Sequence, residues 1–296
     1  MREEGKGYLL AATAAVLWSA MGPLGKWLYT YGVDPLAVVT LRATIAFGTL
    51  ALALAVVDQG LLRVAGRDLP FFAVYGLVGV ACNYACYFYA LRWTTVATAV
   101  LLLYTYPALV TLFSAFFLGE RLTGAKAIAL FLTFAGCALV VQAYDLGALR
   151  WNQRGVLFGL GAGASAAAYS LLGKRALVRY SSWTVACYAF GFGALFLALF
   201  LAGVRSPQAF LLAGYPATAW ALLLALAWFP TLLAYGLFMA SMEHIEASRA
   251  SITATLEPVV ASALAYWLLG EGLTWPQVVG AGLVLGGVLG LRLREA

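Results

Sequence analysis

Long apolar runs separated by short polar or Gly/Pro-rich segments dominate the chain. Cutting the sequence at those segments leaves ten apolar spans, at 8–28, 36–57, 70–91, 95–118, 125–143, 154–173, 182–203, 216–241, 248–269 and 275–293. Each has about the 20 residues that a helix needs to cross a hydrocarbon core of about 30 Å, and each is far longer than a strand of a membrane β-barrel. The pattern therefore predicts an all-α integral membrane protein with ten transmembrane helices.

The segments between the spans carry helix-starting residues and little else. Asp34 followed by Pro35 is typical of an N-cap with proline at the first helical position, and Thr274 three residues before Gln277 has the spacing of a capping box. The connections are too short to hold a soluble domain. We therefore expect any binding site to lie inside the helix bundle.

Composition agrees with a membrane protein. Of the 296 residues, 64% are hydrophobic and only 10% are charged, whereas soluble domains carry about 25% charged residues. The four cysteines all lie inside apolar spans, at Cys82, Cys86, Cys137 and Cys187. We interpret them as packing residues rather than as a disulfide framework or a metal site, so no cofactor is expected.

Lysine and arginine are distributed unequally between the two ends of the helices. With the N-terminus in the cytoplasm, 12 of the 18 Lys and Arg residues fall on the cytoplasmic side, Arg42 lies within a span, and five fall outside, namely Lys26, Arg92, Arg150, Arg154 and Arg205. Because positive residues are retained in the cytoplasm, we predict that both termini are cytoplasmic. The same bias accounts for the net charge of +6, which therefore does not indicate a nucleic-acid partner.

The fourth and ninth spans contain two copies of one motif. Pro258 lies 151 residues after Pro107, and each proline is followed by about ten apolar residues and then by Leu-Gly-Glu-x-Leu-Thr, at 118–123 and 269–274. Leu-Gly-Lys ends both the first and the sixth span. We therefore predict that the chain is a duplication with copies at 1–148 and 149–296.

Five helices per copy is an odd number, so the second copy must enter the membrane from the opposite side. Such inverted repeats recur in secondary transporters, because two equivalent halves can exchange roles around one site at the bilayer midplane. The duplication also bears on the first span, whose basic start resembles a signal peptide. Since its repeat partner lies in the middle of the chain, we expect it to be a retained helix.

Two five-helix copies that each end in proline, an apolar stretch and Leu-Gly-Glu-x-Leu-Thr closely resemble the EamA-type domain of the drug/metabolite transporter superfamily. The resemblance covers essentially the whole chain, which looks most like the bacterial ten-helix exporters of aromatic and other amino acids. It implies a cavity lined by the first, third, fourth, sixth, eighth and ninth helices, with the fifth and tenth at the periphery. It also implies a secondary transporter of the bacterial inner membrane that exports a small-molecule substrate, an amino acid or similar metabolite, by alternating access.

Glu257 is the one acidic residue deep in a span. It precedes Pro258 at the centre of the ninth span, and the repeat places Tyr106 and Pro107 of the fourth span across the pseudo-twofold axis from it. A carboxylate at the midplane is costly enough to indicate a function, which would be to accept a substrate ammonium or to carry a coupling proton. The alternative is a structural carboxylate that neighbouring helices satisfy with hydrogen bonds.

Arg42 is the second charge within a span, about six residues or roughly 9 Å from the end of the second helix. An arginine stem can cover most of that distance to the lipid head groups, so we expect snorkelling or a structural ion pair rather than contact with a substrate carboxylate. Glu120 and Glu271 of the repeated motif are expected to be structural, each near the positive end of the helix that follows it.

Aromatic residues at mid-depth are the clue to the substrate. A tyrosine far from the membrane interface needs a partner for its hydroxyl group, and a group of rings suits an amphipathic zwitterion whose ammonium can meet ring faces or Glu257. Helix packing or lipid contact is the alternative role for any one of them. The residues that the resemblance places around the cavity, with two polar neighbours, are Trp18, Ser19, Asn83, Tyr84, Tyr87, Tyr104, Tyr106, Tyr169, Trp228 and Tyr235.

Glycine and proline interrupt several spans at matched depths. Proline removes a helical hydrogen bond and bends the helix, and Pro230 in the eighth span follows Gly79 in the third by the same 151 residues. The alternative to a hinge is a static kink that helps packing. We predict hinges at Gly22, Pro23, Gly79, Pro107, Pro230 and Pro258.

Other functions have less support. A drug or nucleotide-sugar transporter of the same fold is the main alternative, but a sugar nucleotide needs several cationic groups around the cavity and only Arg42 is available. The sequence has no P-loop, metal-ligand cluster or Ser/His/Asp arrangement, which disfavours an ATP-driven pump and an enzyme. The oligomeric state stays open, because small-residue faces such as 280–282 and 286–287 can pack within the bundle or against another subunit.

Overall fold

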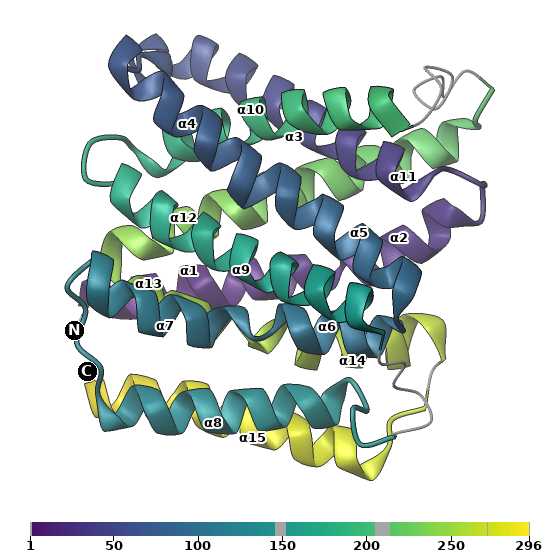
Figure 1. The fold of residues 1–296 in the computed structure, drawn as a ribbon, viewed down its shortest axis with the longest axis vertical. Coiled ribbons are helices and arrows are strands. Elements are labelled where there is room, and N and C mark those ends of the chain that lie inside the picture. Colours follow the sequence, from purple (N-terminus) through teal and green to yellow (C-terminus); the bar gives the residue numbers. More distant parts are fainter. Residues whose placement is uncertain (1, 146–151, 205–213, 271, 296) are drawn as a thin grey trace.

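The computed structural model of the protein describes residues 2–145, 152–204, 214–270 and 272–295. Within these ranges the chain forms ten membrane-crossing segments, which coincide with the ten predicted spans (Figure 1). Eight of the segments are long and apolar enough to cross a membrane. The other two are α8, with 17 residues, and the ninth segment, which is broken into helices of 8 and 14 residues. The predicted fold class is confirmed.

Several segments consist of more than one helix. In the first half of the chain they are α1 (Arg2–Ser19) with α2 (Met21–Tyr29), α3 (Pro35–Val57), α4 (Leu69–Tyr75) with the π-helical η3 (Gly76–Cys82) and α5 (Asn83–Trp93), α6 (Val96–Leu103) with α7 (Tyr106–Phe117), and α8 (Gly124–Val140). Short 3-10 turns, η1 (Gln59–Leu62) and η2 (Gly66–Asp68), join α3 to α4.

The second half has the same organisation. Its segments are α9 (Gln153–Ala176), α10 (Ser182–Val204), α11 (Ala217–Ala227) with the π-helical η5 (Trp228–Leu233) and α12 (Ala234–His244), α13 (Ala247–Ala254) with α14 (Leu256–Leu269), and α15 (Trp275–Glu295). The π-helical segments stand at the same place in both halves, because residues 77–82 and 228–233 are separated by the repeat interval.

Both termini lie at one end of the helix bundle, which we call the terminal face; the opposite end is the far face (Figure 1). The first half starts with α1 at the terminal face, whereas the second half starts with α9 at the far face. The two halves therefore cross the membrane in opposite senses, as an odd number of helices per copy requires. The predicted boundary between residues 148 and 149 lies outside the described residues.

The predicted helix starts are confirmed by their hydrogen bonds. An oxygen of the Asp34 carboxylate accepts from the backbone N–H groups of Leu36 at 2.9 Å and Ala37 at 3.2 Å, which caps α3. At the start of α15, the side-chain oxygen of Gln277 accepts from the backbone N–H of Thr274 at 2.9 Å, as in a capping box. These local signals determine where the helices begin.

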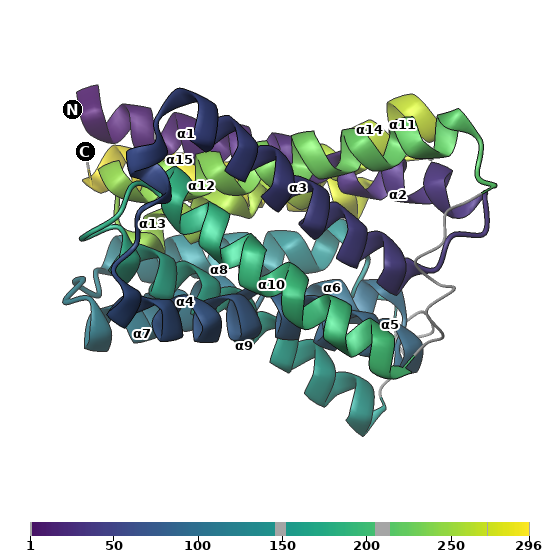
Figure 2. The ribbon, with the colours of Figure 1, turned by 90° about the horizontal axis from the view of Figure 1, so that it is seen from above.

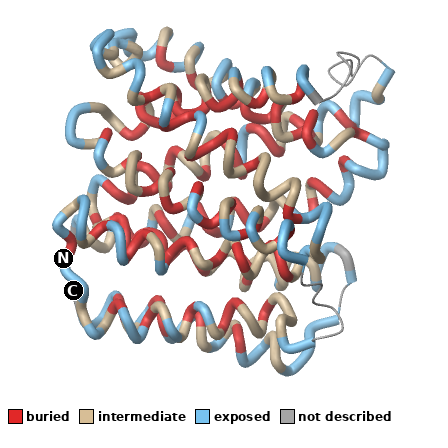
Figure 3. Tube along the Cα trace, viewed as in Figure 1, coloured by how far each residue is buried: buried red, intermediate tan, exposed pale blue. Residues whose placement is uncertain are grey.

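The core of the bundle is aromatic and lies between the two halves. Figure 2 shows α3 and α10 running side by side, and Figure 3 shows that buried positions gather along the inner sides of the helices. Phe72 and Tyr75 of α4, Phe190 of α10 and Phe238 of α12 are among the largest fully buried side chains. Aromatic rings therefore fill much of the centre of the molecule, together with aliphatic and methionine side chains such as Leu197 and Met239.

Helices α8 and α15 form a pair at the edge of the bundle, as the family resemblance implies (Figure 1). Their backbones meet at two glycines: a Cβ atom on Gly280 would lie 2.6 Å from the carbonyl oxygen of Gly136. Gly287 likewise faces Thr133 and Ala129 of α8, whereas Gly282 has open space beside it. Two of the four glycines in the faces named above, Gly280 and Gly287, therefore pack within the bundle.

We expect Gly280→Ala to destabilise the protein by about 1–3 kcal/mol, because a methyl group at this crossing has no room and the two helices must separate. Gly282→Ala is the matched control on the same helix, and it is expected to be neutral or slightly stabilising because alanine favours the helix. The measurement is the thermal unfolding midpoint of each variant in detergent. Equal midpoints for the two variants would contradict the close packing of α8 on α15.

Candidate functional site

The fourth and ninth segments break at the same place in the two halves. Between α6 and α7 the hydroxyl of Thr105 donates to the carbonyl of Leu102 at 2.7 Å, and between α13 and α14 the hydroxyl of Thr255 donates to the carbonyl of Ile252 at 2.6 Å. A proline follows each break, in the first turn of α7 and of α14, where its missing N–H costs nothing. The sequence thus forms two helix ends in the middle of the bundle.

Glu257 lies in the first turn of α14, beside one of these breaks, where the helix dipole favours a negative charge. The hydroxyl of Tyr104, at the end of α6, forms a hydrogen bond with the Glu257 carboxylate. The carboxylate also interacts electrostatically with Tyr87, Tyr106 and Arg42. The structure therefore brings the predicted acidic residue and three of the predicted tyrosines together.

Arg42 of α3 is buried, with 6% of its surface exposed. Its guanidinium carbon lies 4.4 Å from the centre of the Tyr84 ring, and Nη1 contacts the sulfur of Met21 at 3.2 Å. Its Nε–H is buried and has no hydrogen-bond acceptor. The expectation that Arg42 snorkels to the head groups or forms an ion pair is therefore wrong, because the Tyr84 ring holds the guanidinium inside the bundle, where no described carboxylate is at ion-pair distance.

A continuous group of rings extends from this charge into the core. Trp18 lies 4.9 Å from Tyr235, centre to centre, and Tyr235 lies 5.2 Å from both Tyr169 and Phe190. The indole N–H of Trp18 is buried without a hydrogen-bond partner, whereas the hydroxyl groups of Tyr84 and Tyr169 pair with those of Tyr235 and Tyr75. Buried polar groups are nearly always paired in folded proteins, so the unpaired N–H groups of Trp18 and Arg42 indicate a place where a ligand can bind.

Four of the predicted site residues use their polar groups in hydrogen bonds within the protein. Ser19 donates to the carbonyl of Val16 at 2.6 Å, Asn83 donates to the carbonyl of Ala162 in α9 at 2.8 Å, and Tyr106 donates to the carbonyl of Ser251 in α13 at 3.3 Å. Trp228 lies apart from the group of rings: it is 43% exposed, and its indole N–H donates to the Thr49 hydroxyl at 3.1 Å. The contacts of Asn83, Tyr106 and Trp228 join helices to one another, whereas that of Ser19 lies within α1, and of these four residues Trp228 is the exposed one.

The predicted hinge residues all lie at or beside irregular points of the helices. Gly79 is in η3 and Pro230 is in η5, where the missing N–H of proline and the wider π-helical turn go together. Gly22 and Pro23 start α2 just after the break at residue 20, and the first-turn prolines of α7 and α14 are described above. A Cβ atom on Gly79 would lie 3.1 Å from the Cα atom of Tyr169. Helix η3 thus passes close to α9 at the ring group.

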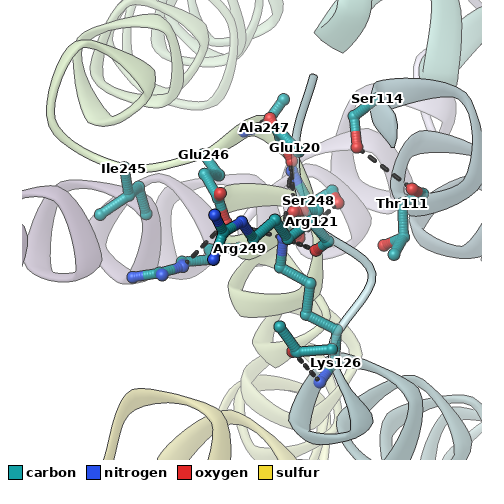
Figure 4. Close-up of polar contacts among 12 residues, drawn as sticks. Thr111, Ser114, Glu120, Arg121, Lys126, Ile245, Glu246, Ala247, Ser248 and Arg249 are labelled. Atoms are coloured by element: carbon teal, nitrogen blue, oxygen red, sulfur yellow. Dashed lines mark hydrogen bonds and ion pairs between the residues drawn. The ribbon is translucent and has the colours of Figure 1, made fainter. Parts of the chain in front are cut away.

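The Leu-Gly-Glu motif ends a helix and directs its glutamate to a different helix. Gly119 has a left-handed backbone, with φ of 70°, and the following N–H of Glu120 bonds back to the carbonyl of Ser114, which closes the end of α7. The Glu120 carboxylate then accepts from the N–H of Ala247 at 2.7 Å, from the N–H of Ser248 at 3.2 Å and from the Ser248 hydroxyl (Figure 4). Glu120 therefore caps α13, not the start of α8 that follows it in sequence, which corrects the expectation; Glu271 lies outside the described residues.

Sequence reasoning missed a buried lysine beside Glu120. Lys126 of α8 has 1% of its surface exposed; its Nζ lies 2.7 Å from a carboxylate oxygen of Glu246 and donates to the carbonyl of Arg121 at 2.8 Å (Figure 4). Arg249 joins Glu246 to Glu4 of α1. The available signal was the charge cluster around residue 246, which local sequence alone does not connect to α8. A network of ion pairs thus connects α1, α8 and the start of α13 at the terminal face.

Comparison with known proteins agrees with the fold. The EamA-like transporter family matches the chain twice, at residues 5–142 and 153–293. An uncharacterised transporter of Archaeoglobus fulgidus is 33% identical over 93% of this chain and 94% of its own. A protein of Streptantibioticus cattleyicolor described as a probable terminal-alkyne amino-acid exporter is 30% identical over 97% and 93%, and a pseudopaline exporter of Pseudomonas aeruginosa is 32% identical over 47% of each chain.

A solved crystal structure matches this one with a TM-score of 0.81 over 97% of this chain and 98% of its own, at 22% sequence identity, which supports the fold alone. The two family matches together cover both halves of the chain, from residue 5 to residue 293. The chain therefore belongs to the EamA-like transporter family of the drug/metabolite transporter superfamily, as a multi-pass membrane transporter and not an enzyme.

Proposed function

We propose that this transporter exports small amphipathic amino acids, including aromatic ones, across the bacterial inner membrane. The observation that carries this proposal is the group of rings around Trp18, Tyr84 and Tyr169, with the unpaired Trp18 N–H, the Arg42 guanidinium over the Tyr84 ring, and the Glu257 carboxylate within electrostatic range of Arg42. Rings accommodate an apolar side chain, and a carboxylate among tyrosines attracts an ammonium group. Both features together suit a molecule that is apolar at one end and charged at the other.

Two relatives support the direction of transport, and one of them also supports the class of cargo. The names of both describe exporters, one of a terminal-alkyne amino acid and one of pseudopaline. A drug or nucleotide-sugar transporter is the alternative. Phosphate groups need several cationic partners, whereas among the described residues around the ring group Arg42 is the one cation, which favours the amino acid.

Alternating access would use the duplication. In this proposal the halves 1–148 and 149–296 exchange roles, bending at the matched breaks of the fourth and ninth segments and at η3 and η5. The ion pairs around Lys126 would have to open when the terminal face opens. The excess of Lys and Arg at that face supports a cytoplasmic position for both termini.

The experiment is counterflow of labelled amino acids in liposomes that contain the purified protein. We expect vesicles preloaded with unlabelled phenylalanine or leucine to take up the labelled amino acid several times faster than protein-free vesicles, because exchange through one site needs no driving force. Protein that elutes as a single species in detergent, yet exchanges none of the amino acids tested, would refute the proposal. Exchange of a drug or a sugar nucleotide instead would favour the alternative.

A further inference from the structure

Arg42 is a buried cation whose surroundings are incomplete. The Tyr84 ring covers one face of the guanidinium and Met21 contacts Nη1, but Nε–H has no acceptor, and the described chain offers no carboxylate close enough for an ion pair. Removing a charge from water without a partner is costly. The geometry therefore leaves a position beside Arg42 that an anion would fill.

Glu257 carries the negative charge that complements Arg42. It interacts electrostatically with Arg42, yet the two side chains are not in contact, and the carboxylate has the Tyr104 hydroxyl as its own hydrogen-bond partner. The helices that carry the two charges are linked through α2, because Arg42 contacts Met21 at its start and α2 packs on α14. A cation and an anion thus lie within electrostatic range of each other without forming an ion pair.

We propose that the head group of a free α-amino acid binds between these two charges, with the carboxylate on Arg42 and the ammonium on Glu257. The inference rests on the proposed function and specifies its substrate class. An α-amino acid carries both charges on one carbon atom, so it can meet both side chains at once. The planar guanidinium suits a carboxylate, which it can bind with two parallel hydrogen bonds.

The rings then receive the side chain. Tyr84 lies under Arg42, and Tyr235, Trp18 and Tyr169 continue from the head-group position toward the core. Molecules with only one of the two charges would leave either Arg42 or Glu257 unmatched. The structure therefore assigns Arg42 as the residue that separates amino acids from amines, and Glu257 as the residue that separates them from carboxylic acids.

Three compounds with the same benzyl side chain test this assignment. Phenylalanine has both charges, phenethylamine lacks the carboxylate and 3-phenylpropionate lacks the ammonium. We expect the wild-type protein to exchange phenylalanine. Phenethylamine and 3-phenylpropionate should each inhibit this exchange about 10- to 100-fold more weakly than unlabelled phenylalanine does, because each lacks one hydrogen-bonded charge. Inhibition by phenethylamine as strong as by phenylalanine would overturn the proposal while leaving amino-acid export intact.

Variants of Arg42 test whether this residue causes the preference for phenylalanine over phenethylamine. Arg42→Gln should lower the apparent affinity for phenylalanine about 10- to 100-fold and leave that for phenethylamine nearly unchanged, so that the preference between the two disappears. Arg42→Lys keeps the charge but not the planar fork, and should retain part of the preference. If Arg42 has a purely structural role, its substitution should lower the apparent affinity for both compounds equally. That result would refute the assignment.

Arg154 offers a matched control, since its guanidinium also lies over a ring, 5.3 Å from the centre of Trp93, but is exposed near the far face. Arg154→Gln should behave as wild type. If neither Arg42 variant folds, the comparison of the three compounds in the wild type still decides the proposal. If no amino acid is exchanged at all, the proposed function itself fails, and that result is distinct from loss of discrimination.

Discussion

Replacing Glu120 with alanine is expected to lower the free energy of unfolding by about 3–5 kcal/mol, the usual cost of breaking a buried charged pair. The carboxylate is 9% exposed and satisfies the N–H groups of Ala247 and Ser248 at the start of α13. Without it, both donors stay buried and unpaired. Thermal unfolding in detergent should show a midpoint lower by on the order of 10 °C.

Asn152→Ala is the matched control, because Asn152 caps α9 in the ordinary way, from its own helix and at an exposed position. Its loss should cost about 1 kcal/mol. Glu120→Gln should lie between the two, since an amide oxygen still accepts a hydrogen bond but carries no charge. If Glu120→Ala and Asn152→Ala shift the midpoint equally, the cap between α7 and α13 is not the contact that holds the terminal face together.

Glu257→Gln is expected to lower amino-acid exchange by at least about tenfold, because a charged hydrogen-bond acceptor for the substrate ammonium is lost. An amide keeps the size of the side chain and can still pair with the Tyr104 hydroxyl. The fold should therefore survive the substitution. The measurement is counterflow of labelled phenylalanine, with uptake driven by a pH gradient recorded in parallel.

The two assays separate three roles for Glu257. Loss of both counterflow and driven uptake indicates substrate binding, and loss of driven uptake alone indicates a coupling carboxylate. If both rates are unchanged, the carboxylate is structural and the binding role is refuted. Glu243→Gln serves as the control, because its carboxylate accepts from the backbone N–H of Ser182 outside the ring group and an amide can do the same.

The site was only partly predictable. Glu257 stood out because an acidic residue is rare in an apolar span, and it lies near three predicted tyrosines, Tyr87, Tyr104 and Tyr106. The direction of a long side chain is not encoded by its depth, so Arg42 was expected to point outward. Trp228 has the right depth but the wrong side of its helix for the ring group, because the π-helical turn at η5 changes the helical period.

The sequence alone determined the ten helices, the duplication and its inverted sense. These follow from the length of apolar runs, from the motif repeated at an interval of 151 residues and from the odd number of helices per copy. They depend on each segment by itself and on the membrane as solvent. Local capping at Asp34 and at Thr274 could be predicted for the same reason.

Only the tertiary structure decided which charges meet. Glu120 caps α13, which lies 127 residues further along the chain, and Arg42 rests on a ring of α5 rather than at the lipid surface. Such contacts depend on how helices rotate and cross, which small residues such as Gly136 and Gly280 set through close backbone packing. Periodicity within one helix carries no information on the side chains of a distant helix, so the partners of these charges emerge only when the halves pack together.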